Sequence, residues 1–345
     1  MGAPFSIVAA DRHDAILRTA YRRHVCAIRS MKDLHEADLD GCLRLVREHD
    51  PADRYVICPS SEYLNHYLLR HRAWFEERRC DIPLVDQALY ETVTNKWSFR
   101  EVCREARFTV PALVEPGPAS VPFVAKPRVN VNGLGRSLYP QLVFTAADWD
   151  DCRAAMGDLD DYYFEELIDG PSYYLLYFLP KHASEPVFAW SQRNLAQQLH
   201  GKSMVCAVSD TLHQWPIGHR MADLLRDLGF HGLAMVEVIQ RDTEYVVIEM
   251  NPRLWGPSQL LLNAKTDLLR AFAEESLYGR IEEADPCAGR DASYVWLGGV
   301  SAGLTWHERT PRFPRLALTS RLGSDVYLRP DTIGVFVNEL MGRPA

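Results

Sequence analysis

One segment, residues 237–253, constrains this chain most, because it has the pattern of a β-hairpin with carboxylates inside its apolar strands. Two apolar, β-branched runs flank a polar turn, and a hairpin centred near Thr243 would place Glu237 opposite Glu249. Glu249 lies between two apolar residues, so its strand is predicted to be buried. The sequence therefore predicts two carboxylates side by side on a buried sheet.

Asn251 and Arg253 extend this arrangement, because side chains two residues apart on a strand share a face. Glu237, Glu249 and Asn251 are predicted metal ligands, since carboxylate and amide oxygens suit Mg²⁺ together with phosphate oxygens and water. Arg253 is a candidate catalytic residue, because a guanidinium beside a metal can bind phosphate or a developing oxyanion. The alternative is a solvated hairpin whose acids face water.

This pattern resembles the magnesium motif of the ATP-grasp superfamily, whose members use ATP to activate carboxylates. Glu237 is followed twelve residues later by Glu249-Met250-Asn251-Pro252-Arg253, and the continuation Asn-Pro-Arg-Leu-Trp-Gly is similar to the bacterial carboligase branch, a group of carboxylate-amine ligases. The resemblance covers roughly residues 55–275. It implies an α/β chain of three parts, which are a doubly wound α/β domain at 1–92, a small α+β lid at 93–168 and a larger α+β domain at 169–345.

Composition is typical of a soluble globular enzyme, since 345 residues with 47% hydrophobic and 24% charged residues can form two or three subdomain cores. The 38 basic and 46 acidic residues give a formal charge of −8, so no nucleic-acid partner is expected. No apolar run approaches ~18 residues, so no membrane partner is expected either. The eight cysteines include no C-x-x-C pair, which favours reduced thiols in a cytoplasmic protein.

The N-terminal region alternates strands and helices, which predicts an α/β layer. Short parallel strands are expected at Phe5–Ala9 and Tyr55–Cys58, with helical stretches near Ala15–Arg22 and Leu39–Glu48. No glycine-rich turn follows the first strand, so this layer is not expected to bind a dinucleotide. A proline-rich connection at 111–122 is expected to lead into a strand, a glycine loop, a strand, a helix and a strand.

Lys126 stands in an otherwise apolar strand and precedes a loop that contains Asn132, Gly133 and Gly135. A lysine in this position must find an anion or reach solvent, and a glycine loop can direct backbone N–H groups at phosphate. A tight turn is the alternative explanation for the glycines. The resemblance favours the first explanation. It implies that Lys126 contacts the α and β phosphates and acts in catalysis, while residues 130–137 close as a lid over ATP.

Further nucleotide contacts follow from the resemblance. Lys96 is similar to an earlier lysine of the family that also reaches the phosphates, although an exposed lysine in a first helical turn is the alternative. A strand that ends in two acids and a glycine resembles the hinge between lid and large domain. There, Glu165 is expected to accept from the adenine amine beside Glu166, while Leu167 offers its backbone and Ile168 packs against the ring.

Ser172 departs from the family pattern, because families with this hinge commonly have a ribose-binding glutamate shortly after the glycine. Ser172 is the candidate nucleotide contact at that position. Arg193 and Arg220 are candidates for binding a substrate carboxylate, with a solvated surface role as the alternative for each.

These features predict an ATP-grasp ligase that uses ATP and Mg²⁺, for which Mn²⁺ can substitute. The expected reaction converts a carboxylate and ATP into an acyl phosphate and ADP, after which an amine displaces phosphate to form an amide. The expected partners are small carboxylates and amines, such as amino acids or natural-product precursors, and a homodimer is allowed.

Three other interpretations use the same residues. A phosphotransferase would pass the γ phosphate to a hydroxyl group of a small substrate. A regulatory protein that binds nucleotide without turnover is favoured only by Ser172. A biotin-type carboxylase would share Glu249, Asn251 and Arg253, but 345 residues leave little room for its additional regions.

Overall fold

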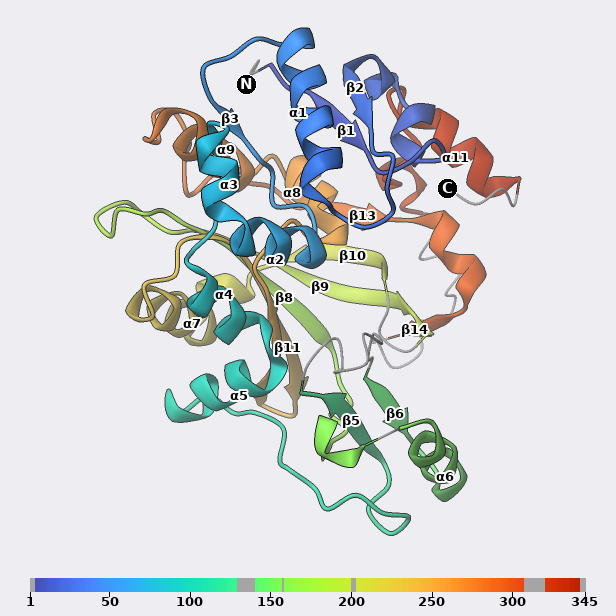
Figure 1. Ribbon diagram of the computed structural model, residues 1–345. Helices are drawn as coiled ribbons and strands as arrows, with labels where there is room; N and C mark the ends of the chain where they lie inside the picture. Colours follow the sequence, from blue (N-terminus) through green and yellow to red (C-terminus); the bar gives the residue numbers. More distant parts are fainter. Residues whose placement is uncertain (1–3, 129–139, 157, 200–202, 307–319, 342–345) are drawn as a thin grey trace.

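A seven-stranded sheet forms the centre of the computed structural model, which describes residues 4–128, 140–156, 158–199, 203–306 and 320–341 (Figure 1). Its strands are β8 (Ser172–Leu179), β9 (Phe188–Gln198), β10 (Met204–Asp210), β11 (Gly232–Arg241), β12 (Glu244–Asn251), β13 (Ser293–Val295) and β14 (Leu304–Trp306). They lie in the order β12-β11-β8-β9-β10-β13, with β14 paired to β9, and the pairing is antiparallel. Every residue of β8 is buried, because helices cover both faces of the sheet.

Helices of different parts of the chain cover the two faces. Tyr173, Leu175 and Tyr177 of β8 belong to a core that includes buried side chains of four helices that precede the sheet and of one helix between β10 and β11. These helices are α2 (Glu62–Arg70), α3 (Arg72–Glu77), α4 (Gln87–Thr94), α5 (Lys96–Glu105) and α7 (Pro216–Asp227). Leu176 and Phe178 face the other way, toward α8 (Gln259–Ala264) and α9 (Leu268–Tyr278).

A separate three-stranded sheet lies below the large one in Figure 1 and has the order of elements that the sequence predicts. It contains β5 (Phe123–Pro127), β6 (Gln141–Val143), α6 (Ala146–Ala155) and β7 (Tyr162–Glu166). The side chains of Phe123, Trp149 and Phe164 form its core through edge-to-face ring contacts. A capping box of Thr145 and Asp148 fixes the start of α6.

The N-terminal strands are parallel as predicted, but they belong to two separate two-stranded sheets. One sheet pairs β1 (Ile7–Ala9) with β2 (Val25–Ile28), and the other pairs β3 (Tyr55–Val56) with β4 (Cys80–Asp81). Helix α1 (Glu36–His49) contains the predicted stretch 39–48. The predicted helix at 15–22 is instead two 3-10 helices, because extended Thr19 ends the first and caps the second.

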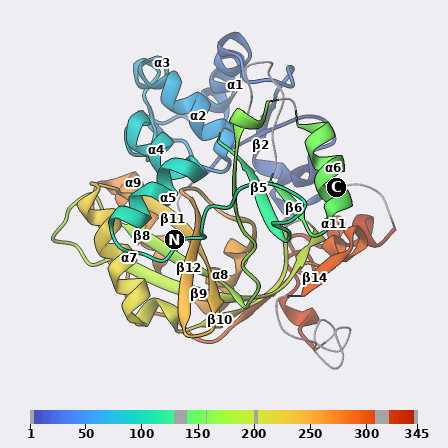
Figure 2. The same ribbon diagram turned by 90° about the horizontal axis from the view of Figure 1, so that it is seen from below.

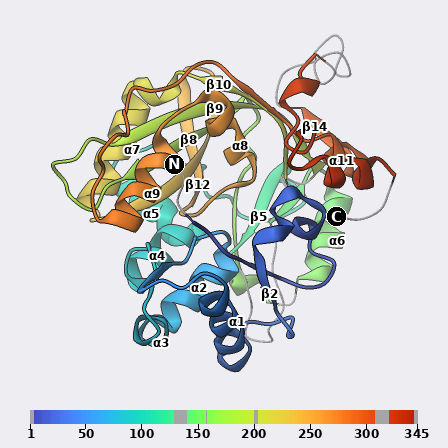
Figure 3. The ribbon, with the colours of Figure 1, turned by 90° about the horizontal axis from the view of Figure 1, so that it is seen from above.

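The end of the described chain returns to the N-terminal region, where α11 (Ile333–Leu340) contacts the 3-10 helix Ala15–Arg18 (Figure 3). Tyr21 Oη donates to Asp331 Oδ2 at 2.6 Å, and Ala20 N donates to Asp331 O at 2.8 Å. Helix α4 spans residue 92, the expected boundary between the N-terminal domain and the lid. Among the described residues, no helix is long and apolar enough to cross a membrane.

Candidate active site

The register of the β11–β12 hairpin brings Glu237 opposite Glu249, as predicted. Nearer the turn, Val238 pairs with Val247, so Ile248 is an extra residue between the two pairs. Such a bulge changes which residue lies opposite a given residue of the partner strand, and so which side chains share a face. Without it, the pairing from the turn would continue to Ile248, and an apolar side chain would face Glu237.

The two carboxylates belong to a polar row that crosses the sheet. Directly paired residues of antiparallel strands share a face, and the pairs align Glu249, Glu237, Tyr174 and Gln192 across β12, β11, β8 and β9. The hairpin lies next to α5, a helix that precedes the large sheet in the sequence (Figure 2). The Glu249 end of the row therefore borders the space between β12 and α5.

Lys96 enters this space from the first turn of α5 and forms an ion pair with Glu249. Asn95 fixes this turn, since its side chain accepts from Ser98 N at 3.0 Å and donates to Arg128 O at 2.7 Å. Lys96 is partly buried, with 18% of its side chain exposed. Its predicted place among the phosphate ligands is therefore compatible with the structure, whereas the exposed alternative is not.

Arg253 and Asn251 continue the polar chain beyond the strand, as predicted. Arg253 Nη2 donates to Asn251 Oδ1 at 2.9 Å, and Asn251 Nδ2 donates to Glu249 Oε1 at 2.9 Å. The amide nitrogen of Asn251, rather than its oxygen, faces Glu249, so the amide would turn to become a metal ligand.

The two facing carboxylates have opposite pKa shifts. Burial and the negative charge of Glu249 raise the pKa of Glu237 to about 7. Burial opposes ionisation of Glu249 as well, but the ion pair with Lys96 lowers the pKa of Glu249 to about 2. Neighbouring buried carboxylates repel each other, so the pair provides a strong attraction for a cation.

The donor set fits a divalent metal ion that shares its ligands with a phosphate. Glu237 and Glu249 supply charged oxygens, and Asn251 supplies an amide oxygen after rotation. No group of three or more His, Cys, Asp or Glu side chains is placed to hold a metal within the described ranges. The protein thus offers part of a coordination shell, which is the usual arrangement for Mg²⁺ with nucleotides.

Lys126 forms an ion pair with Glu165 across the lid sheet, and both side chains are almost fully buried. Glu165 thus faces a lysine, and its expected bond to adenine stays a prediction. Glu166 accepts from Ala112 N at 2.9 Å and from Arg241 Nη1 at 2.8 Å, so it ties the lid to the metal hairpin instead of extending into the site.

The remaining nucleotide candidates have different positions. Ile168 is buried and Leu167 is partly buried immediately after β7. Ser172 lies next to the metal candidates, because its Oγ donates to Glu237 Oε1 at 2.9 Å. It is fully buried, and its role as a nucleotide contact stays a prediction. Three further candidates lie outside the described residues: Asn132, Gly133 and Gly135.

Arg193 and Arg220 are not grouped with the facing carboxylates, and their role as substrate ligands stays a prediction. Arg193 stands between Gln192 and Asn194 on β9, so strand alternation directs it to the opposite face. Arg220, on α7, donates to Arg107 O at 3.1 Å and lies over the ring of Phe108 at 4.5 Å. It covers the end of α5.

Sequence reasoning missed Glu62, which begins α2 and comes from the N-terminal region. Leu254 N donates to Pro59 O at 3.1 Å, and this bond brings the segment before α2 against the metal hairpin. Burial opposes ionisation of Glu62, but a hydrogen bond from His66 and the positive charges of Lys96 and Arg253 lower its pKa. No motif marks Glu62, because its place in the site depends on contacts between distant segments.

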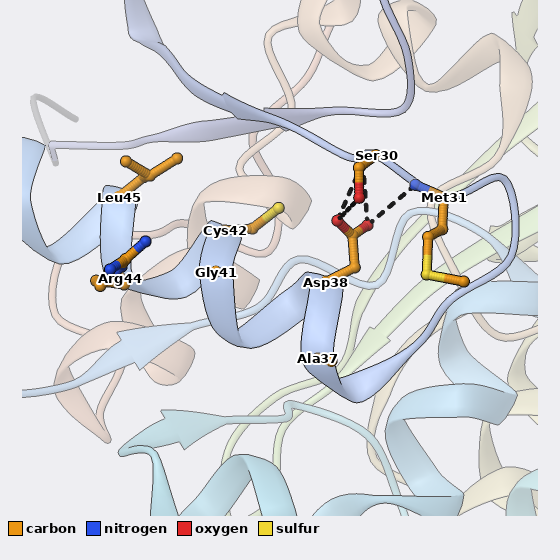
Figure 4. A pocket seen from close by; sticks show the side chains of 8 residues that line it. All are labelled: Ser30, Met31, Ala37, Asp38, Gly41, Cys42, Arg44 and Leu45. Atoms are coloured by element: carbon orange, nitrogen blue, oxygen red, sulfur yellow. Dashed lines mark hydrogen bonds between the residues drawn. The ribbon is translucent and has the colours of Figure 1, made fainter.

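A cavity of about 400 Å³ lies elsewhere, beside α1 (Figure 4). There Asp38 Oδ1 accepts from Ser30 N at 3.0 Å and its other oxygen accepts from Met31 N at 3.4 Å. The residues that line the cavity come from 30–45, and none is a candidate for nucleotide or metal binding. Asp38 therefore serves to fasten the loop before α1.

Solved structures show what the fold is similar to. N5-carboxyaminoimidazole ribonucleotide synthetase from Thermus thermophilus matches with a TM-score of 0.61 and 14% identity, over 86% of this chain and 78% of that chain. A biotin carboxylase from Campylobacter jejuni matches with 0.60 and 14%, over 83% and 73%. An L-amino acid ligase from Bacillus licheniformis matches with 0.53 and 15%, over 79% and 73%.

No family model matches the sequence, and no curated protein sequence matches it. The structural neighbours are ATP-grasp proteins, and the likeness extends over most of this chain. The chain therefore has the ATP-grasp fold.

Proposed function

We propose that this protein is an ATP-dependent ligase that joins a carboxylate to an amine through an acyl phosphate. The observation that carries the proposal is the meeting of Glu237 and Glu249 with Lys96 and Arg253 on one face of the sheet. Two carboxylates for a metal, with cations for phosphate oxygens, form the set that phosphoryl transfer from ATP requires.

In the proposed first step, a substrate carboxylate oxygen attacks the γ phosphorus, and the bond from that phosphorus to the bridging oxygen of ADP breaks. Lys96 and Lys126 would bind phosphate oxygens and exchange their carboxylate partners for them. Bound at Glu237, Glu249 and Asn251, Mg²⁺ would neutralise charge on the β and γ phosphates.

In the second step, the amine nitrogen attacks the acyl carbon, the carbon–oxygen bond to phosphate breaks, and the nitrogen loses a proton. Arg253 would stabilise the oxyanion of the tetrahedral adduct with its positive charge, since its guanidinium lies beside Asn251 at the end of the metal hairpin. Exclusion of water is needed, because an acyl phosphate hydrolyses, and closure of residues 130–137 would provide it.

The choice of ligase over the other interpretations rests on the sequence Asn-Pro-Arg-Leu-Trp-Gly at 251–256, which is similar to the carboligase branch. The TM-scores of 0.60 to the carboxylase and 0.61 to the synthetase are nearly equal, so the fold by itself does not select the reaction. A phosphotransferase would use the same metal and lysines. The products must decide among these reactions.

Isotope transfer tests the proposal directly. The protein is first screened for ADP release with pools of amino acids, small acids including bicarbonate, and hydroxylated compounds. The active acid is then labelled with ¹⁸O, and the released phosphate is analysed by mass spectrometry. We expect one label in phosphate and trapping of a hydroxamate by hydroxylamine, both reduced in Arg253→Ala and retained in Arg220→Ala. Phosphate bound to the product, with no label in free phosphate, would establish the phosphotransferase instead.

A further inference from the structure

A chain of buried hydrogen bonds leads from β9 across β8 to the metal hairpin. Gln192 Nε2 donates to Asn194 Oδ1 at 2.8 Å, and Asn194 Nδ2 donates to Ser172 Oγ at 2.8 Å. Ser172 Oγ then donates to Glu237 Oε1 at 2.9 Å. Gln192, Asn194 and Ser172 are each 0% exposed, so water does not compete for these bonds.

The direction of this chain is fixed by chemistry. A serine hydroxyl has one proton, and because Ser172 Oγ accepts from the Asn194 amide, its own proton is available for Glu237. As an ionised metal ligand Glu237 only accepts, and rotation of the Asn194 amide alone would set its nitrogen against Gln192 Nε2, two donors. Every donor in the chain therefore points toward Glu237 Oε1, which leaves Glu237 Oε2 for other partners.

We propose that Ser172, Asn194 and Gln192 are positioning residues that hold the Glu237 carboxylate in the orientation in which it binds the nucleotide's metal ion. This inference rests on the proposed function, since it takes Glu237 as a metal ligand. Outer partners that orient a ligand commonly contribute 10- to 100-fold to metal affinity. The bonds also explain how Gln192 and Asn194, two polar side chains on one face of β9, are fully buried.

The chain offers a matched control for this proposal. Ser191 lies on β9 next to Gln192, is 0% exposed like Ser172, and its Oγ donates to Asp210 O at 2.8 Å. It faces away from Glu237 by strand alternation. Ser191→Ala thus removes a buried serine hydroxyl from the same sheet without touching the chain that ends at Glu237.

Mn²⁺ binding measured by electron paramagnetic resonance, with a non-hydrolysable ATP analogue, tests the inference without turnover. We expect Ser172→Ala to weaken Mn²⁺ binding by about tenfold and Asn194→Leu by about threefold, whereas Ser191→Ala leaves it unchanged. Ser172→Thr keeps the hydroxyl, so it should restore most of the lost affinity. Circular dichroism and thermal melting select the variants that remain folded.

Glu237→Gln separates a failure of this inference from a failure of the proposed function. If Glu237→Gln loses Mn²⁺ binding while folded Ser172→Ala and Asn194→Leu bind normally, the positioning role is wrong and the metal site stands. If the unaltered protein binds no Mn²⁺ with the ATP analogue, the proposed function fails together with the inference. Equal weakening by Ser191→Ala and Ser172→Ala would show a general packing effect and would overturn the inference.

Discussion

Two lysine–carboxylate pairs in this protein have the same chemistry but different construction. Lys126 and Glu165 belong to neighbouring strands of the lid sheet, and their side chains are 7% and 3% exposed. Lys96 and Glu249 belong to a helix and a strand 153 residues apart, and their side chains are 18% and 23% exposed. One pair is built into a single sheet, whereas the other joins two regions of the chain.

The comparison shows how a site can combine rigid and exchangeable contacts. A fully buried ion pair is costly to break, because the charge left behind has lost its hydration. A partly exposed pair is weaker, since water can replace a missing partner. We therefore expect Lys126 to contribute strongly to the stability of the lid, and Lys96 to exchange Glu249 for phosphate more easily.

The largest effect is expected from Glu249→Gln, which keeps the volume of the side chain but removes its charge. Loss of a charged ligand should lower kcat/KM by about a hundredfold or more, which is about 3 kcal/mol of transition-state stabilisation. Steady-state kinetics at varied Mg²⁺ measures this. Glu244→Gln, an exposed residue of the same strand, is the control and should retain activity. A Glu249→Gln enzyme with full, magnesium-dependent activity would exclude the metal site.

The two lysines can be compared directly by unfolding in denaturant. Lys126→Met should lower the free energy of unfolding by about 3 kcal/mol, because it leaves Glu165 buried without a partner. Lys96→Met should cost about 1 kcal/mol, since Glu249 keeps its bond from Asn251. Adding Glu165→Met to Lys126→Met should recover most of the loss. Equal losses from the two single variants would remove the distinction between the pairs.

A smaller effect concerns pH. The pKa of Glu237 is raised to about 7 in the folded protein, so the folded state holds a proton that the unfolded state has lost above about pH 4.5. Stability should therefore decline as pH rises from 5 to 8, by about 1 to 3 kcal/mol, and then level off. Denaturant unfolding in EDTA measures the decline. Glu237→Gln should flatten it, and an unchanged slope in this variant would assign the titration to another group.

The smallest effect is expected from Arg220→Ala. The Arg220 guanidinium binds the carbonyl of Arg107 and lies over Phe108, and it is largely exposed. Its removal should lower the free energy of unfolding by roughly 0.5 kcal/mol and leave KM for the carboxylate substrate unchanged. A large increase in that KM would return Arg220 to the substrate site.

Several parts of the site could be predicted from sequence, because they depend on neighbours within one hairpin or strand. Strand alternation in the apolar runs is enough to place Glu249 and Asn251 on one face and Lys126 inside the lid sheet. The facing of Glu237 and Glu249 was also predicted, although the bulge at Ile248 is what produces it. A hairpin centred on Thr243 pairs residue 237 with residue 249. The actual two-residue turn at 242–243 gives the same pair because Ile248 is an extra residue in the second strand.

Tertiary structure decided the contacts that join distant segments. The sequence of α5 predicts a helix with Lys96 in its first turn, but only the packing of α5 against β12 brings Lys96 to Glu249. Arg193 and Arg220 carry the same charge, but they lie in different places. Strand alternation directs Arg193 to the opposite face of the sheet from Gln192, and Arg220 lies over Phe108 beyond the end of α5. Ser172 has no metal or phosphate motif around it, and the pairing of β8 with β11 places it beside Glu237 on the same face of the sheet. Local pattern sets which side of a strand a residue occupies, whereas burial of apolar surface between segments sets what that side faces.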